Sequence, residues 1–310
     1  MSAPRIGFVG LGNMGGRIAR RIVDGGSPVL GFDLSPDAVT AAGATAAPEV
    51  AEVVAESDIV LLSLPDSMVV ERVVFGEGGV ADAVRAGQVV VDLSTAAPDS
   101  TRRIAQTLAS RQVAYLDAGV SGGAAAAEKG ALTLMVGGPE DALERVRPVL
   151  ELFATKIFLI GPSGAGHTTK LLNNFLNAVA LSATAEAMVA AKAADLDLAT
   201  VLEVFNASSG VNFATLNRFP RIITGDYLEG GLSNTLMLKD VTLYVELLGR
   251  LGVASLNAAG PVASFGLARA LGYADAISNT VVDAIGDISG GIRLADVGAE
   301  PDSHDQEGSR

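Results

Sequence analysis

The chain has 310 residues, of which 49% are hydrophobic and 18% are charged, so it can bury a large core and is not disordered. Its formal net charge of −13 argues against nucleic acid and anionic membranes as partners. Cysteine is absent and only two histidines occur, so we expect no disulfide, thiol nucleophile or metal site. We expect no signal peptide before the first strand-like run, and no apolar run is long enough to span a membrane. We therefore expect a soluble, cytoplasmic protein.

The first 32 residues read as a strand, a glycine-rich turn, a helix and a second strand. The strands cover residues 5–9 and 28–32, and the sequence G-x-G-x-x-G lies between residues 10 and 15. In such a unit the first glycine permits a tight turn, the second lets a pyrophosphate approach, and the third lets helix and strand pack closely. A glycine-rich turn without a ligand is the alternative. We predict a dinucleotide site with contacts from Gly10, Leu11, Gly12, Asn13 and Met14.

Asp33 follows the second strand and bears on the choice of cofactor. A carboxylate at this position accepts hydrogen bonds from the adenosine ribose and repels a 2′-phosphate. Residues 34–36 include no arginine that could receive that phosphate. Both observations favour NAD over NADP. The alternative is that Asp33 is the N-cap of a helix over residues 36–42.

Strands and helices continue to alternate as far as residue 161. Further strands are expected at 58–64, 88–93, 112–116, 132–136 and 156–160, with helices from 65, over 98–111 and over 139–153. This alternation predicts an α/β fold with a largely parallel, doubly wound Rossmann sheet, whose ligands bind at the carboxyl ends of strands. Polar loop chemistry is the alternative role for residues at those ends. We expect the cofactor to contact Leu64, Pro65 and Thr95, which lie there beside Ser94.

After residue 161 the strand pattern stops and helical patterns follow, over 167–194, 199–207, 233–251, 261–271 and 274–287. We therefore predict an NAD-binding Rossmann domain over residues 1–161. An all-α domain for substrate binding and oligomerisation is expected over 162–294, joined through a long helix. Residues 295–310 are polar and are expected to be disordered.

The long helix carries the candidate catalytic residue. It has no Gly or Pro between His167 and Ala194 and would be about 40 Å long. One face is polar and includes His167, Lys170, Asn174 and Asn177. Lys170 lies near the helix N-terminus, where the macrodipole disfavours its charge and makes the amine easier to deprotonate.

Lys170 is therefore the candidate proton donor or acceptor, because no Cys or tractable His competes with it. Asn174, one turn further on, could hold a substrate hydroxyl or orient the amine. The alternative is a solvated lysine with amides that bridge neighbouring helices. We expect His167 to be a helix-start residue rather than a catalyst.

Two other short motifs could contribute to a site. Ser121, Gly122 and Gly123 follow a strand, and consecutive glycines can direct backbone N–H groups at a carboxylate; a simple turn is the alternative. Lys239 and Asp240 lie in an otherwise apolar helix. They could form a surface pair, or Lys239 could face the cofactor and lower the pKa of Lys170.

Together these motifs resemble the β-hydroxyacid dehydrogenases, the family of 3-hydroxyisobutyrate dehydrogenase and tartronate semialdehyde reductase. The resemblance covers about residues 5 to 295 and is carried by residues 7–15, 117–123, 164–174 and 239–240. It implies NAD-dependent oxidation of a small 3-hydroxy acid, or reduction of the matching semialdehyde, by a homodimer or homotetramer. It further implies that Lys170 is the general acid/base supported by Asn174, that Ser121, Gly122 and Gly123 hold the substrate carboxylate, and that Lys239 touches the cofactor.

The chain departs from the family pattern at three positions that border the expected pocket. Gly119 stands where the family usually has Pro, Asn212 where it often has Ser, and Leu232 near a usual Phe. These departures leave the chemistry intact and bear on which substrates the pocket accepts. The rivals are an imine reductase, whose family members have another residue in place of Lys170, and a non-catalytic NAD-binding sensor or interaction protein. The intact set of Lys170, Asn174 and Ser121 argues against the sensor.

Overall fold

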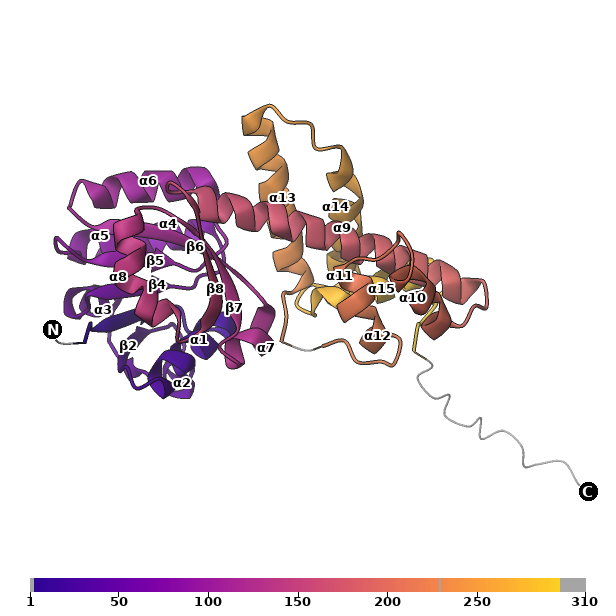
Figure 1. Ribbon diagram of the computed structural model, residues 1–310, viewed down its shortest axis with the longest axis horizontal. Helices are drawn as coiled ribbons and strands as arrows, with labels where there is room; N and C mark the ends of the chain where they lie inside the picture. The colour runs from indigo at the N-terminus through magenta and orange to yellow at the C-terminus, as the bar shows by residue number, and fades with distance from the viewer. Residues whose placement is uncertain (1–2, 229, 296–310) are drawn as a thin grey trace, which may run out of the picture. The chain divides into compact units, whose positions relative to one another are not determined.

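The computed structural model describes residues 3–228 and 230–295, which form two compact units (Figure 1). The N-terminal unit contains the residues up to Phe175 together with Lys239–Ser255, and the C-terminal unit contains the rest. The division falls inside two helices, α9 (Ala165–Ala193) and α13 (Asn234–Leu251), whereas the change from strands to helices comes at residue 161. Apart from Ala295, the tail expected to be disordered lies outside the described residues.

The N-terminal unit is built on an eight-stranded sheet in the order β3-β2-β1-β4-β5-β6-β7-β8. Every neighbouring pair is parallel except β6 and β7, which are antiparallel. This arrangement confirms the predicted largely parallel sheet, and only the two-residue β3 has no counterpart in the sequence pattern. The strands are β1 (Ile6–Val9), β2 (Val29–Phe32), β3 (Thr45–Ala46), β4 (Ile59–Leu62), β5 (Val89–Asp92), β6 (Ala114–Ser121), β7 (Leu132–Gly137) and β8 (Ala154–Gly161).

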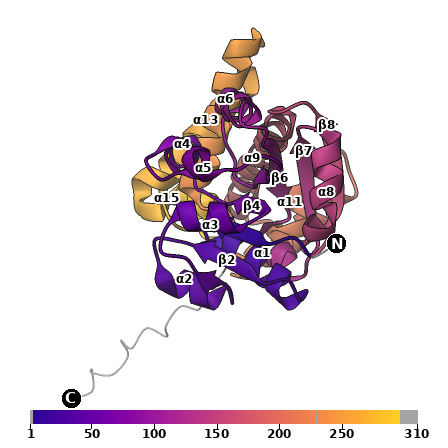
Figure 2. The same ribbon diagram turned by 90° about the vertical axis from the view of Figure 1, so that its left-hand side faces the viewer.

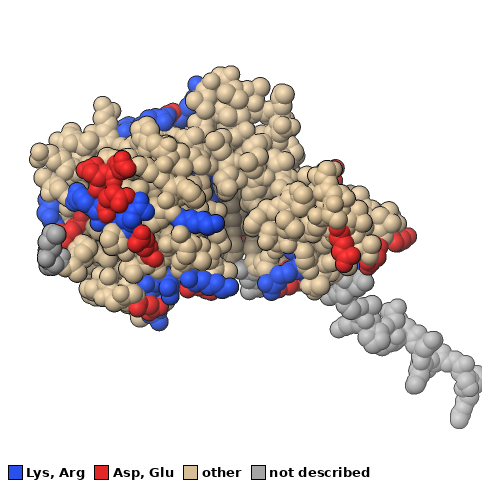
Figure 3. Space-filling model, viewed as in Figure 1, with Lys and Arg blue, Asp and Glu red and all other residues tan. Residues whose placement is uncertain are grey.

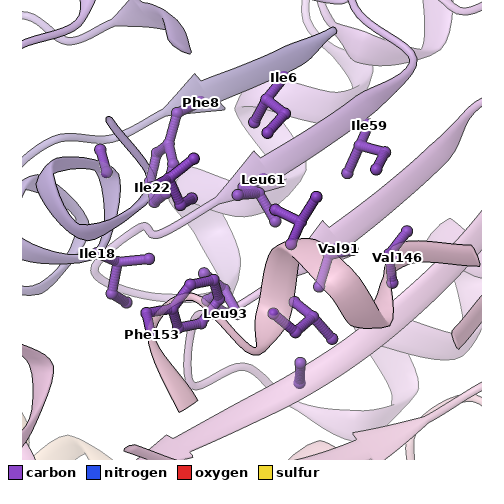
Figure 4. Packing of buried hydrophobic residues seen from close by; sticks show 14 of the residues in the cluster. Ile6, Phe8, Ile18, Ile22, Ile59, Leu61, Val91, Leu93, Val146 and Phe153 are labelled. Carbon is purple, nitrogen blue, oxygen red and sulfur yellow. The ribbon is translucent and has the colours of Figure 1, made fainter. Parts of the chain in front are cut away.

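Helices cover both faces of this sheet, and each face has its own apolar core. In Figure 2, α4 and α5 lie on one side of β4 and α8 on the other. Figure 4 shows the core on the α8 side, where Ile18 and Ile22 of α1 and Val146 of α8 pack with Phe8 and Leu61. The central strands read as continuous apolar runs because both of their faces are buried. The helices of this unit are α1 (Asn13–Asp24), α2 (Pro36–Ala41), α3 (Val50–Glu56), α4 (Ser67–Phe75), α5 (Val80–Ala83), α6 (Pro98–Ala109), α7 (Gly123–Glu128) and α8 (Glu140–Leu150).

Strand β6 is longer than its apolar pattern indicates. The pattern ends at residue 116, but residues Asp117 to Ser121 continue the strand because they pair with β7, Asp117 opposite Gly137 and Ser121 opposite Thr133. The motif that reads as a loop in the sequence is therefore mostly strand. This matters for the site, because alternate residues of a strand point to the same face.

The C-terminal unit is helical, as predicted. The helix expected over residues 274–287 is wrong at its start, since residues 274–277 are not helical. There the backbone bonds to the segment that precedes and begins α13 rather than to itself. Ala274 O accepts from Thr235 N, Ala276 O accepts from Asn234 N, and Ile277 forms an isolated antiparallel bridge with Ser233. Besides α9 and α13, the elements are α10 (Leu198–Asn206), α11 (Phe213–Asn217), α12 (Phe219–Ile222), η1 (Leu256–Ala258), α14 (Ala259–Ala268), η2 (Arg269–Tyr273), η3 (Ser278–Thr280) and α15 (Val281–Ile288).

Figure 3 shows basic and acidic side chains beside one another on the visible face of the N-terminal unit, in keeping with its surface ion pairs. Within residues 3–228 and 230–295, no helix has the length and apolarity needed to cross a bilayer. In the same residues, no group of three or more His, Asp or Glu side chains is arranged to hold a metal ion.

Candidate active site

In the glycine-rich turn between β1 and α1, the tight backbone contacts require glycine at positions 10 and 15, whereas open space lies next to Gly12. A Cβ on Gly10, whose φ is 90°, would lie 2.3 Å from Ser63 O, and one on Gly15 would lie 2.0 Å from Gly10 O. At Gly12, by contrast, no atom lies within 4 Å of the Cβ position. Open space above a bare backbone at the start of a 12-residue helix is what a pyrophosphate requires. The residues present therefore fit a dinucleotide.

Asp33 is tied to this turn rather than to the following helix. Its Oδ2 accepts from the backbone N–H of Leu11 at 2.7 Å and its Oδ1 from that of Ser35 at 2.9 Å. Ser35, not Asp33, occupies the N-cap position of α2, so the alternative capping role is wrong. The carboxylate thus stands beside the glycine-rich turn, with the almost fully exposed Leu34 next to it.

Lys239 joins the loops at the carboxyl ends of β4 and β5. Its Nζ donates to Pro65 O and to Thr95 O, both at 3.0 Å. A further bond, from Leu64 N to Ser94 Oγ at 2.9 Å, holds the same two loops together. The structure therefore brings Leu64, Pro65, Thr95 and Lys239 to one edge of the sheet, and Lys239 is not part of a simple surface pair.

Asp117 fixes the start of α9 on the sheet. Its fully buried carboxylate accepts from the backbone N–H groups of Gly164 at 2.7 Å and His167 at 2.8 Å. Two glycines allow this close approach, since a Cβ on Gly166 would lie 2.3 Å from Met135 O and one on Gly137 would lie 2.8 Å from Gly166 N. These hydrogen bonds and close backbone contacts explain why the first turns of α9 belong to the N-terminal unit.

The same face of β6 carries three residues of the site. Asp117, Gly119 and Ser121 alternate along the strand, while Ala118 and Val120 point into the apolar core. A Cβ on Gly119 would lie 2.6 Å from Lys170 Cβ and 3.1 Å from Lys170 Cγ. Gly119 therefore makes room for the stem of Lys170, and Ser121, two residues on, points to that same side. The alternation of Asp117, Gly119 and Ser121 with the apolar Ala118 and Val120 is the sequence signal that could have indicated this face.

Lys170 has the perturbed amine that the sequence predicts. Burial lowers its pKa from 10.5 to about 8; the Asp240 carboxylate opposes this shift and the Lys239 ammonium adds to it. The position near the helix N-terminus predicted that the pKa would be lowered, but desolvation is the main cause. An amine with this pKa exchanges a proton near neutral pH.

Asp240 is a candidate site residue that the sequence reading did not assign to the site. It is 1% exposed, and its Oδ2 accepts from Asn174 Nδ2 at 2.5 Å. Its Oδ1 lies 3.1 Å from Lys239 Nζ, although no described group gives that oxygen a well-aligned hydrogen bond. A charged residue in an apolar helical run was the available signal. Asp240 thus bonds to Asn174, pairs with Lys239 and acts on Lys170 through its charge.

The segment Ser121–Gly123 ends β6 and begins α7. Gly122 has a φ of 130° and Gly123 a φ of 69°, so both occupy the left-handed region that favours glycine. A Cβ on Gly123 would meet no atom within 4 Å. The segment therefore forms the glycine-dependent turn that the sequence indicates, and its proposed binding of a substrate carboxylate stays a prediction.

Other candidate residues have structural roles. His167 is fully buried, and its Nδ1 lies 2.7 Å from Thr101 Oγ1, which makes it a packed helix-start residue. Asn212 caps α11, its Oδ1 accepting from Ala214 N at 2.8 Å. Because Asn and Ser are both good N-caps, this departure from the family pattern preserves the cap. Leu232 is partly buried, and its carbonyl accepts from Ser278 N.

A dinucleotide turn on an open, largely parallel sheet, together with a lysine whose pKa is lowered to about 8 by burial, is typical of a dinucleotide-dependent oxidoreductase. Residues 5–161 match the family model described as the NAD-binding domain of 6-phosphogluconate dehydrogenase. Residues 164–284 match the one described as NAD-binding of NADP-dependent 3-hydroxyisobutyrate dehydrogenase.

Among curated relatives, a 2-(hydroxymethyl)glutarate dehydrogenase of Eubacterium barkeri is 39% identical over 78% of this chain and 81% of its own. An NAD-dependent L-serine dehydrogenase of Pseudomonas aeruginosa is also 39% identical, over 78% of this chain and 84% of its own. Among solved structures, the Mycobacterium tuberculosis 3-hydroxyisobutyrate dehydrogenase with L-serine has 30% identity and a TM-score of 0.80, covering 93% of this chain and 99% of that one. An imine reductase from Pseudomonas sp. is 22% identical, which shows the shared fold alone.

The chain belongs to the β-hydroxyacid dehydrogenases. It is accordingly an NAD-binding dehydrogenase of small hydroxy acids, as its motifs indicate, and the imine reductases are more distant.

Proposed function

We propose that this protein oxidises acids of the form HO–CH₂–CHR–COO⁻ to the corresponding semialdehydes, with NAD as cofactor and Lys170 as general base. The observation that carries the proposal is the lowered pKa of Lys170, whose stem lies against Gly119 on the strand that ends in Ser121. The substrates in the relatives' names support the formula. 3-Hydroxyisobutyrate, L-serine and 2-(hydroxymethyl)glutarate all carry a hydroxymethyl group next to a carboxylate, and they differ only in R.

The residues that would hold NAD line the N-terminal unit. The turn from Gly10 to Met14 would receive the pyrophosphate and Asp33 the ribose hydroxyls, with Leu64, Pro65, Thr95 and Lys239 along the sheet edge. Held there, NAD would supply the hydride acceptor for oxidation of the alcohol, and its reduced form the hydride donor for the reverse reaction. The Asp33 carboxylate and the absence of an arginine at residues 34–36 support NAD over NADP.

Lys170 carries the proton in this scheme. In oxidation its neutral Nζ takes the hydroxyl proton, and in reduction its ammonium returns a proton to the aldehyde oxygen. With a pKa of about 8, both forms are present near neutral pH. General acid/base help of this kind is worth about 10²–10⁴-fold in rate.

Ser121, Gly122 and Gly123 would bind the carboxylate next to the hydroxymethyl group. Asn174 supports the reacting oxygen: its Nδ2 is bound to the Asp240 carboxylate, and its Oδ1, which accepts from Asn173 Nδ2 at 3.5 Å, has a second lone pair for a substrate donor. The chain's remaining sequence-based expectations stay predictions. They are a cofactor domain over 1–161, a substrate and self-association domain over 162–294, and a cytoplasmic homodimer or homotetramer.

The test follows nicotinamide absorbance with acids in which R is methyl, ammonium or carboxyethyl. Wild type should oxidise at least one of them, and Lys170→Met should bind NAD normally but lose turnover by about 10²-fold or more. Lys156→Met, which changes an exposed lysine of β8, is the matched control. Near-normal kcat in Lys170→Met would show that Lys170 is not the general base. Tight NAD binding with no turnover of any acid would favour the non-catalytic NAD-binding protein.

A further inference from the structure

Thr133 lies directly opposite Ser121 in the antiparallel pair of β6 and β7, within the N-terminal unit. Residues opposed in this way point to the same face of a sheet, with Cβ atoms about 4.5–5.5 Å apart. That face also carries the stem of Lys170, because Gly119, which the stem contacts, lies two residues before Ser121 on β6. The residues on either side of Thr133 point the other way, into the apolar core. Two hydroxyls therefore stand side by side on the face that holds the proposed base.

Both hydroxyls are free to meet a ligand. Within residues 3–228 and 230–295, neither Ser121 nor Thr133 has a hydrogen-bond partner for its side chain, although Ser and Thr on neighbouring strands commonly bond to each other. Both residues are only partly buried, so a small molecule can reach them. Each hydroxyl can donate one hydrogen, and their spacing lets the two donate to different oxygens of one carboxylate.

The glycine turn after β6 lies against the same part of β7. A Cβ on Gly122 would lie 3.2 Å from Leu132 Cδ2 and 3.8 Å from Leu132 Cα, so the turn contacts the residue that precedes Thr133. At Gly123, by contrast, a Cβ would meet no atom within 4 Å. Backbone N–H groups of consecutive glycines can point at an anion. The turn and the two hydroxyls therefore gather around open space at the end of β6.

The distance along β6 suits the proposed chemistry. Ser121 lies about 7 Å beyond Gly119, the position that accommodates the Lys170 stem, since each strand residue adds about 3.4 Å. In an acid HO–CH₂–CHR–COO⁻ two carbons separate the hydroxyl from the carboxylate. An acid whose carboxylate lies at the two hydroxyls can thus direct its alcohol toward Lys170.

We infer that Thr133 is a second hydroxyl donor to the substrate carboxylate and acts as a binding residue together with Ser121. The inference rests on the proposed function. Because the carboxylate is unchanged by the reaction, Thr133 would contribute to substrate binding and not to the chemical step. The alternative is that Thr133 serves the strand alone, through its branched Cβ.

The first experiment removes the hydroxyl and keeps the branch. With the acid in which R is methyl, Thr133→Val should raise KM about 10–100-fold, as loss of a hydrogen bond to a charged group does, with kcat within about 3-fold of wild type. Thr133→Ser, which restores the hydroxyl, should bring KM back to within about 3-fold of wild type. Thr155→Val, at an exposed threonine of the neighbouring strand β8, is the matched control. An unchanged KM in Thr133→Val, or an equal loss in Thr133→Ser, would overturn the inference.

The second experiment measures carboxylate binding without turnover. The NAD-loaded enzyme is titrated calorimetrically with isobutyrate, which has the carboxylate but no hydroxyl to oxidise. Wild type should bind it, and Thr133→Val should bind it about 10-fold more weakly. Equal affinities, or no binding to wild type, would overturn the inference even if hydroxy acids are oxidised. Binding that depends on Thr133 without turnover of any hydroxy acid would uphold the carboxylate site and overturn the proposed function.

Discussion

Asn174 donates from Nδ2 to Oδ2 of Asp240 at 2.5 Å, so the amide one turn after the proposed base is held by a buried carboxylate of α13. Since an ionised carboxylate only accepts hydrogen bonds, this contact also decides which way the amide faces. The same carboxylate raises the pKa of Lys170, against the larger lowering by burial. Asp240 therefore holds one candidate site residue and shifts the pKa of another.

Replacing Asp240 by Asn should shift the pH dependence of oxidation. Without the carboxylate, the pKa of Lys170 falls further below about 8, and the neutral amine is present at lower pH. The rising limb of kcat/KM for oxidation should move to lower pH, measured between about pH 6 and 10. Asp99→Asn, at a half-exposed surface ion pair, should leave the profile in place. A shift to higher pH would contradict the assignment.

Removing the charge of Lys170 should stabilise the fold at neutral pH. A pKa lowered from 10.5 to about 8 means that the folded state disfavours the ammonium, at 1.36 kcal/mol per pKa unit. Because the side chain is partly exposed, we expect Lys170→Met to gain about 1–3 kcal/mol at pH 7.

The sign of the pH effect provides the check. Between about pH 8 and 10.5 the unfolded chain binds more protons at this lysine than the folded one, so wild-type stability rises with pH there. Urea unfolding of wild type and Lys170→Met should therefore differ most below pH 8 and converge above 10.5. A variant less stable than wild type at pH 7 would show that the lysine is not strained by burial.

A methyl group at position 119 should displace the proposed base. The new Cβ would lie 2.6 Å from Lys170 Cβ, and α9 cannot easily retreat because Asp117 holds its first turn. Gly119→Ala should lower kcat about 10–100-fold, as misplacement of a catalytic group does, and leave NAD affinity unchanged. Gly249→Ala, where the Cβ meets no atom within 4 Å, is the control. Unchanged kcat in Gly119→Ala would refute the positioning role.

The choice of cofactor should respond to Leu34. This side chain is 94% exposed beside Asp33, so an arginine there could reach a 2′-phosphate without disturbing the core. We expect Leu34→Arg to lower KM for NADP about 10-fold, through a charge-assisted contact, with KM for NAD little changed. Leu196→Arg, at an exposed position of the C-terminal unit, controls for the added charge. Better use of NADP than NAD by wild type would contradict the role of Asp33.

Local sequence was enough for much of the N-terminal unit. Residues 5–33 specify strand, turn, helix and strand through contacts between near neighbours, and the glycine spacing alone predicts the open backbone at Gly12. The helix over 274–287 was wrong because its first residues pair with Ser233 and Asn234, some 40 positions away along the chain. Periodicity within one segment carries no information about such a partner.

The sequence by itself determined the family and the glycine-rich turn and singled out Lys170 as the candidate base, since each depends on residue types at short, fixed spacing. Only the tertiary structure decided that Asp117 caps α9, that Gly119 accommodates the lysine stem, and that Asp240 holds Asn174. These contacts join residues 47 to 66 positions apart, so neither spacing nor propensity could reveal them. The pKa of Lys170 shows the division most clearly. Its place near a helix end predicted the direction, but burial, a property of the packed fold, is the principal cause.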